Sequence, residues 1–429
     1  MTAVDAPLVS ILITTYNRSR LLRRAIESTL GQDFTNFELV VIDDCSPDDT
    51  AKVVAAFNDP RIRYIRNETN VGSKEGDRAI LRRFVYELMR GKYFVYLCDD
   101  DYWLFPDLLN RQVEAFRTHD NLAMVMGGQL AYFLTTPDSY FGHSTDDTLT
   151  VTLHNLDRFF DPKTKITKSP HFYFHGNGKA LFPEGYMTPE AFLLEFAKEP
   201  TTKNIIGGAM LYSREIFIRS GTLKSPQGSQ WQAGYELKLG PACYGGTIYF
   251  DEPSIVSEIR PSNASFQRTQ VEHYLDSIKS IEIAFETPLT DPKLAARWKS
   301  LRKIRAETIR NLSYAFQANA LTILREGSLS LCSDDNVRYP VTARHVVPAL
   351  WRNRALPGSA LVRCNALYGL HWLTGGRLFK REQYWRQRLS HLKQRTLAMP
   401  QQVWRRVWEG LRAIWRYLPQ TLQKVLRPR

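Results

Sequence analysis

Short apolar runs alternate with stretches of helical spacing in the first hundred residues, and this alternation limits the possible folds more than any other feature. The predicted strands are residues 8–14, 37–42, 62–65 and 93–97. The predicted helices between them are residues 18–30, 48–57 and 76–89. Strands that alternate with helices predict an α/β fold with a mostly parallel sheet, covered by helices on both faces.

Polar residues follow each predicted strand, and in such a sheet the carboxyl ends of the strands share one edge where ligands bind. They are Thr15, Tyr16, Arg18, Asp43, Asp44, Gly72, Lys74, Asp99, Asp100 and Asp101. A carboxylate can accept hydrogen bonds from a base or a ribose, and adjacent carboxylates can hold a Mg²⁺ or Mn²⁺ ion that neutralises a diphosphate. The pattern predicts a nucleotide site with a hard divalent cation.

Other interpretations of these residues stay open. Asp43 and Asp44, followed by Ser-Pro, are equally compatible with a turn and a helix cap. Asn and Gly in residues 70–74 are ordinary turn residues. Three consecutive acids after a buried strand favour a functional site, because their mutual repulsion is costly unless a cation or hydrogen-bond donors compensate it.

The segments VSILITTYNR, FELVVIDDCSPDDT, NVG and YFVYLCDDDYWLFPDLL resemble successive motifs of family 2 glycosyltransferases, over residues 8–130 and weakly over 204–266. The resemblance implies the Rossmann-like GT-A fold and inverting transfer from a nucleotide-diphosphate sugar, usually UDP-linked. It implies that a set of side chains holds the nucleotide and donor sugar. These are Thr15, Tyr16, Arg18, Asp43, Asp44, Lys74 and Asp99.

The family's Asp-x-Asp metal motif falls on residues 98–100, where a cysteine replaces the first acid. The resemblance implies that Asp100 is the ligand of Mn²⁺ or Mg²⁺, with Asp101 as a reserve ligand. Cys98 is interpreted as a small buried filler in preference to a soft ligand.

The acceptor half departs from the family pattern. Ala233 and Gly234 stand where the family has a Glu-Asp pair that supplies the general base. Glu236 is the nearest carboxylate and is the predicted base, needed because a sugar hydroxyl must lose its proton as it attacks. A glutamate early in a helix is also typical of a solvated or capping residue. Arg260 replaces a family histidine and can contact the diphosphate.

Further residues of this half have weaker assignments. Asp251 and Glu252 are alternative bases that the family pattern marks as structural. An insertion at about residues 130–203 is rich in aromatic residues and histidine and is predicted to bind the acceptor. His171 and His175 are four residues apart, but the Phe-Tyr-Phe between them favours a strand or loop over a helical metal site.

The end of the chain is strongly basic. Residues 291–429 carry 27 basic and 7 acidic side chains, while the whole chain has a net charge of +13, so the first 290 residues are acidic. Six of the nine tryptophans follow residue 350. From residue 401 onward, Trp404, Trp408 and Trp415 share an apolar helical face and arginines lie on the others. This composition predicts helices that bind an anionic membrane surface.

Two other partners of the tail are weighed against the membrane. The apolar stripe can dock on the catalytic domain or in a dimer, and its arginines can meet nucleic acid. We expect no nucleic acid, because the other face is densely apolar and no DNA-reading motif is present. Five widely spaced cysteines without a Cys-x-x-Cys pair indicate a reducing compartment. No apolar run reaches the length of a membrane span, and no secretory signal is recognised.

The sequence therefore predicts a GT-A domain over residues 1–288, with a nucleotide half to about residue 130 and an acceptor half from 131. A helical, basic, membrane-associating region follows over residues 289–429. The predicted protein is cytoplasmic, attached to the inner face of the cell membrane, and transfers a sugar to a glycan or lipid-linked acceptor. The alternative is a catalytically silent nucleotide-binding scaffold, which the missing Glu-Asp pair keeps open.

Overall fold

The computed structural model describes part of the chain and divides it into two compact units. The described residues are 6–133, 151–168, 172–174, 180–201, 203, 208–224, 234–259, 270–326, 329–330 and 338–339. One unit comprises residues 1–312 with 332–334, and the other comprises 313–331 with 335–429. Within the described ranges, no helix combines the length and the hydropathy needed to cross a membrane.

A ten-stranded sheet runs through the first unit in the order β10-β12-β6-β11-β4-β1-β2-β3, with β5 beside β12 and β9 beside β6. The first four strands of the sequence pair with one another in parallel: β1 with β2 and β4, and β2 with β3. They are β1 (Val9–Thr15), β2 (Phe37–Asp43), β3 (Ile62–Arg66) and β4 (Tyr93–Cys98). The α/β fold class and all four predicted strands are confirmed.

Antiparallel strands enter beyond β4. They are β5 (Asp101–Trp103), β9 (Phe172–Phe174), β10 (Gly185–Met187) and β11 (Met210–Ser213). The long strands β6 (Leu122–Phe133) and β12 (Gly246–Ile259) run parallel to each other. Short strand pairs lie outside this sheet, namely β7 (Phe160–Asp161) with β8 (Ile166–Thr167), and β13 (Leu329–Ser330) with β14 (Arg338–Tyr339).

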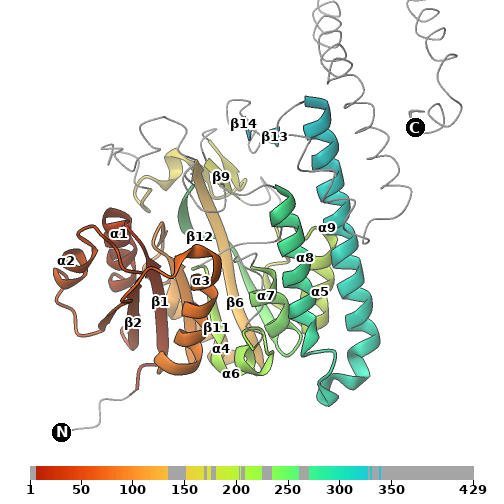
Figure 1. Cartoon of the computed structure of the whole chain (residues 1–429), viewed down its shortest axis with the longest axis horizontal. Coiled ribbons are helices and arrows are strands. Elements are labelled where there is room, and N and C mark those ends of the chain that lie inside the picture. The colour runs from red at the N-terminus through yellow and green to blue at the C-terminus, as the bar shows by residue number, and fades with distance from the viewer. Residues whose placement is uncertain are drawn as a thin grey trace, which may run out of the picture. The chain divides into compact units, whose positions relative to one another are not determined.

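Helices α1, α2 and α3 lie beside β1 and β2, α4 packs on β6 and β11, and α5, α7 and α8 gather beside the second half (Figure 1). The helices are α1 (Ser19–Leu30), α2 (Thr50–Ala55), α3 (Gly72–Arg83), α4 (Leu108–Thr118), α5 (Pro189–Lys198), α6 (Arg214–Arg219), α7 (Tyr235–Ala242), α8 (Gln270–Glu286) and α9 (Trp298–Glu326). A π-helical turn, Phe84–Leu88, extends α3, and 3₁₀ turns occur at Leu156–Arg158 and Pro292–Arg297.

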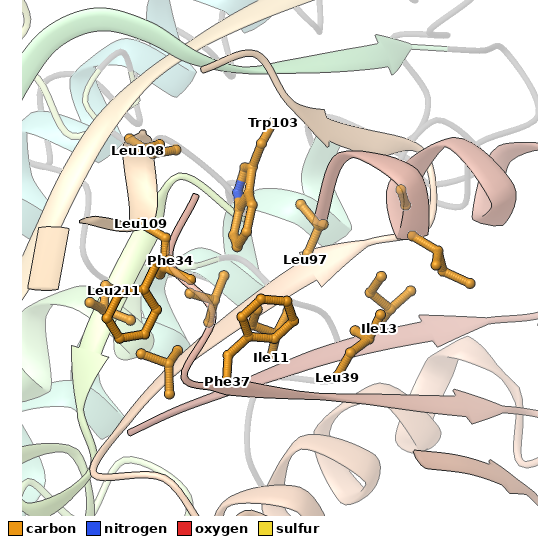
Figure 2. Packing of buried hydrophobic residues seen from close by; sticks show 14 of the residues in the cluster. Ile11, Ile13, Phe34, Phe37, Leu39, Leu97, Trp103, Leu108, Leu109 and Leu211 are labelled. Carbon is orange, nitrogen blue, oxygen red and sulfur yellow. The ribbon is translucent and has the colours of Figure 1, made fainter. Parts of the chain in front are cut away.

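The core of the first half follows the two-residue period of the strands. Alternate side chains of β1, β2 and β4, such as Ile11, Leu39 and Leu97, pack on one face with Trp103 (Figure 2). Burying each such aliphatic side chain contributes about 1.5–3 kcal/mol. The Trp103 indole N–H donates to the Gly208 carbonyl oxygen at 2.7 Å, which satisfies the buried ring nitrogen. This core fixes the positions at which β1, β2 and β4 end.

Candidate active site

The ends of β1 and β4 bring the predicted donor-binding residues together. The two strands are adjacent, with Thr14 paired to Cys98 in register. The Thr15 hydroxyl donates to Asp99 Oδ2 at 2.8 Å, and Arg18 Nη1 donates to Asp99 Oδ1 at 3.0 Å and to Asp100 Oδ2 at 3.2 Å. Asp99 raises the pKa of the Arg18 guanidinium above its ordinary value. Four predicted residues thus form one hydrogen-bonded group.

Asp100 and Asp101 crowd negative charge at the same edge. Asp101 opens β5, opposite Ser257 of β12, and is 5% exposed. Burial and then the neighbouring Asp100 raise the pKa of Asp101 well above its ordinary value. Burial raises the pKa of Asp100 to about 6, although Arg18 opposes this shift. A bound cation would relieve this cost, so the residues present fit a divalent cation.

Asp43 is a brace between strands and is completely buried. It accepts hydrogen bonds from the Ser46 N–H at 2.8 Å, the Tyr64 hydroxyl at 2.5 Å and Arg66 Nη1 at 2.7 Å. The sequence interpretation missed Tyr64 and Arg66. Their signal is a spacing of two along β3, which places both side chains on the face that meets Asp43.

Asp44 caps a helix. Its carboxylate accepts from the Asn67 side chain at 2.8 Å, the Val71 N–H at 3.0 Å and the Gly72 N–H at 3.1 Å. This helix is α3, which begins at Gly72, so the predicted start at residue 76 was wrong. The Asp44 carboxylate satisfies the first backbone donors and so allows the earlier start. Asp44 thus supports the start of α3 and not that of α2, the helix after Ser46-Pro47 for which the cap was weighed. The Lys74 side chain lies outside the described residues.

Tyr16 and Asn17 form the turn that leaves β1. The Tyr16 side chain is 47% exposed, next to the hydrogen-bonded group of Thr15, Arg18 and Asp99. Asn17 adopts a left-handed conformation (φ 54°) and its N–H donates to the Ser46 hydroxyl at 2.9 Å. The turn is therefore held against the loop that follows β2, with an exposed aromatic ring.

Glu236 lies in the first turn of α7 and is 5% exposed, so the interpretation as a solvated residue was wrong. Arg78 of α3 pairs with Glu236 Oε1 and also donates to the Thr222 carbonyl oxygen at 2.7 Å. The Glu236 N–H donates to Ser280 of α8 at 3.0 Å. The sequence interpretation missed Arg78, because nothing in the helical spacing distinguishes it from its neighbouring arginines. Glu236 is thus anchored to elements of both halves.

The remaining predicted residues fall into two groups. Asp251 lies 3.8 Å from Lys165 Nζ, and Glu252 pairs with Arg111 at 2.6 Å, so both have structural partners. Ala233, Arg260, His171 and His175, and the basic helices of the tail, lie outside the described residues.

The family model "Glycosyl transferase family 2" matches residues 10–221, which contain β1 to β4 and the acidic edge. The chain belongs to glycosyl transferase family 2. The relatives of this glycosyltransferase include WcaA, named for colanic acid biosynthesis in Escherichia coli K12, which is 41% identical over 99 residues, 23% of this chain and 34% of the relative.

Two further relatives carry more specific names. The succinoglycan biosynthesis protein ExoO of Rhizobium meliloti is 38% identical over 113 residues, 26% of this chain and 31% of ExoO. The UDP-Glc:alpha-D-GlcNAc-diphosphoundecaprenol beta-1,3-glucosyltransferase WfaP of E. coli is 34% identical over 104 residues, 24% of this chain and 39% of WfaP. The chain thus spans less than half the length of each of these relatives.

Solved structures confirm the predicted GT-A fold. S. aureus TarS 1–349 in complex with UDP-GlcNAc aligns with a TM-score of 0.52 at 14% identity, covering 87% of this chain and 92% of that chain. The crystal structure of S. aureus TarS 1–349 aligns with a TM-score of 0.51 at 13% identity, covering 87% of this chain and 91% of that chain. At such identity the likeness is one of fold.

Proposed function

We propose that this family 2 glycosyltransferase transfers a sugar from a UDP-linked donor to a glycan or lipid-linked acceptor in cell-surface polysaccharide synthesis. The group formed by Thr15, Arg18 and Asp99 beside Asp100 carries the proposal, because it gathers hydrogen-bonding and acidic side chains at the ligand edge of the sheet. The relatives named for colanic acid and succinoglycan support the pathway class, and the name of WfaP supports the donor and acceptor classes.

The nucleotide would lie along the ends of β1, β2 and β4. The exposed Tyr16 ring offers a stacking surface for a base, while Asp44 and Asp99 offer acceptors for base and ribose donors. Arg18 and Lys74 supply positive charge for the diphosphate. Asp43 holds the end of β2 in place through Tyr64 and Arg66.

Asp100, with Asp101, would hold a Mn²⁺ or Mg²⁺ ion. Their carboxylates are hard oxygen ligands, and burial, together with the neighbouring carboxylates, raises the pKa of both groups. When bound, such a cation supplies the positive charge that stabilises a departing diphosphate. Arg18 would orient Asp99 and Asp100 through its hydrogen bonds to both carboxylates.

Glu236 is the proposed general base, accepting the proton of the attacking hydroxyl in an inverting transfer. Arg78 and Ser280 hold this residue in one place, as a base requires. If Glu236→Gln kept full turnover while Asp100→Ala lost it, the assignment of the base would fall and the rest of the proposal would stand.

A catalytically silent scaffold is the second candidate, and two observations favour it. Ala233 and Gly234 replace the family's Glu-Asp pair. In addition, Glu236 is buried and paired with Arg78, so an acceptor hydroxyl would have to compete with that cation for the carboxylate. Such a scaffold would still bind nucleotide at the acidic edge but would leave a donor sugar untransferred.

Thermal unfolding with UDP, GDP, dTDP and CDP, each with and without Mn²⁺, tests the donor class. A ligand at 100 times its dissociation constant stabilises the folded state by about 2.7 kcal/mol. Of the four nucleotides, we expect only UDP to raise the unfolding temperature in a Mn²⁺-dependent way. The Asp100→Ala variant should lose this rise. A folded sample that shifts with none of the four would contradict both candidates, and a shift without turnover on any UDP-sugar would favour the scaffold.

Residues 289–429 would form a membrane-associating region after a catalytic domain of residues 1–288, with the protein at the inner face of the cell membrane. The test uses the full chain, because a truncation near residue 290 would remove Leu301, Ile304 and Leu312, which are buried in the first unit. We expect wild-type protein to float with anionic liposomes and a Trp404→Ala/Trp408→Ala/Trp415→Ala variant to float less, with neutral liposomes as the control. Equal flotation of wild type and variant with anionic liposomes would exclude this role of the tail. Binding to nucleic acid that weakens steeply with salt, in a protein whose flotation does not depend on lipid charge, would indicate nucleic acid as the partner.

A further inference from the structure

We propose that Cys98 is itself a ligand of the cation in this site, and that its sulfur makes the site favour softer divalent cations over Mg²⁺. The inference rests on the proposed metal dependence. The sequence favoured a packing role for this cysteine, which stands where the family motif has an acid. Replacing the acid by a cysteine exchanges an oxygen ligand for a sulfur ligand and leaves the position of the donor set in the fold unchanged.

The geometry of the donor set supports this role. The Sγ atom of Cys98 and carboxylate oxygens of Asp100 and Asp101 all lie within 4.8 Å of one another. Bonds from a metal ion to sulfur and oxygen measure about 2.0–2.3 Å, so neighbouring ligand atoms of one ion lie about 3–4 Å apart. Side-chain movements of about an ångström or less would therefore let the three atoms share an ion.

The surroundings of Cys98 argue against a filler. Cys243, at the end of α7, is completely buried, and its thiol donates to the Leu239 carbonyl oxygen at 3.1 Å. Cys98 is instead only partly buried, at the last position of β4, where the sheet ends and ligands enter. A packing role would enclose the side chain as it encloses Cys243.

The backbone holds the sulfur in place. Cys98 pairs with Thr14 in the parallel register of β1 and β4, and Asp101 pairs with Ser257 in β5 and β12. The donor set thus spans the end of one strand and the start of the next, with only Asp99 and Asp100 between them. A thiolate prefers soft and borderline cations, whereas Mg²⁺ prefers oxygen ligands alone.

The test measures the affinities of Mg²⁺, Mn²⁺ and Cd²⁺ for the full chain by calorimetry, with UDP present and with a reductant that contains no thiol. The variants are Cys98→Ser, Cys98→Asp and, as the matched control, Cys45→Ser. Cys45 is partly buried in the loop after β2 and lies outside the donor set. We expect Cys98→Ser to weaken Cd²⁺ binding about tenfold or more and to change Mg²⁺ binding less than about threefold. Cys98→Asp should improve Mg²⁺ relative to Cd²⁺, and Cys45→Ser should change neither.

An optical readout is independent of activity. Co²⁺ bound to wild-type protein should show the near-ultraviolet thiolate-to-metal absorption, and Cys98→Ser should lose it while Cys45→Ser keeps it. Equal Cd²⁺ affinities in wild type and both Cys98 variants, with an unchanged Co²⁺ spectrum, would overturn the role of Cys98 and leave the proposed function intact. Failure of wild-type protein to bind any of these cations with UDP would instead overturn the metal dependence, and this inference with it.

Discussion

Two buried glutamates, one in each half of the first unit, are held in different ways. In the nucleotide half, Glu38 is buried on β2 and accepts from Ser10, Arg63 and Arg90, all within that half. Burial alone would raise the pKa of Glu38, but these hydrogen bonds lower it below its ordinary value. In the acceptor half, Glu236 of α7 takes its cation from Arg78, which belongs to α3 of the nucleotide half. The candidate base therefore depends on the donor-binding half for its position.

Removal of Arg78 should produce the largest effect and tests this dependence directly. Arg78→Met leaves Glu236 charged and buried, and it also removes the donor to the Thr222 carbonyl oxygen. Breaking a buried ion pair by removing one partner costs about 3–5 kcal/mol. We expect a loss of that size in the free energy of unfolding in urea.

Arg82→Met is the matched control, because Arg82 is exposed on the same helix and should change stability by less than about 0.5 kcal/mol. The double variant Arg78→Met/Glu236→Leu should recover much of the loss, since no unpaired charge is left. A single variant as stable as wild type would show that the acceptor half does not depend on this contact.

Removal of Asp100 tests the nucleotide half. Asp100→Ala should abolish the Mn²⁺-dependent part of the stabilisation by UDP, about 2.7 kcal/mol at 100 times the dissociation constant. Glu114→Ala, an exposed acid of α4 whose side chain is 59% exposed, serves as the control and should keep the full shift. An undiminished shift in Asp100→Ala would move the metal assignment to Asp101.

The sequence predicted the nucleotide half better than the acceptor half for a physical reason. The strands of the first half are continuous apolar runs, and their ends place Thr15, Asp99 and Asp100 together through parallel pairing alone. Glu236 was predicted only because it is the nearest carboxylate in the sequence to Ala233 and Gly234, where the family has its Glu-Asp pair. Its partner Arg78 lies 158 positions earlier in the chain. Contacts of this kind depend on how helices pack, which spacing along one segment does not encode.

Lys238 of α7 is completely buried with its Nζ donating to the Gly234 carbonyl oxygen at 3.1 Å, and it gives a smaller, pH-dependent effect in the acceptor half. Burial lowers its pKa to about 7, whereas the unfolded chain keeps the ordinary value of 10.5. Between these values the unfolded state binds more protons, so stability rises with pH through this window. From pH 7 to pH 9, wild type should gain about 2 kcal/mol over Lys238→Met in urea unfolding. Parallel pH profiles of the two proteins would contradict a neutral buried lysine.

Replacement of Tyr16 should change stability least and binding selectively. Tyr16 and Tyr186 are both 47% exposed, one at the end of β1 and the other on β10 in the acceptor half. Tyr16→Ala should change the free energy of unfolding by less than about 0.5 kcal/mol, because the ring faces solvent. Loss of base stacking costs about 1–3 kcal/mol, so UDP affinity measured by calorimetry should fall at least about fivefold.

Tyr186→Ala is the control and should leave UDP affinity unchanged even if it lowers stability through the lost stacking on His119. Equal UDP affinities in the two variants would show that the nucleotide does not use the exposed ring beside Asp99, and the contrast between the halves would then rest on the buried charges alone.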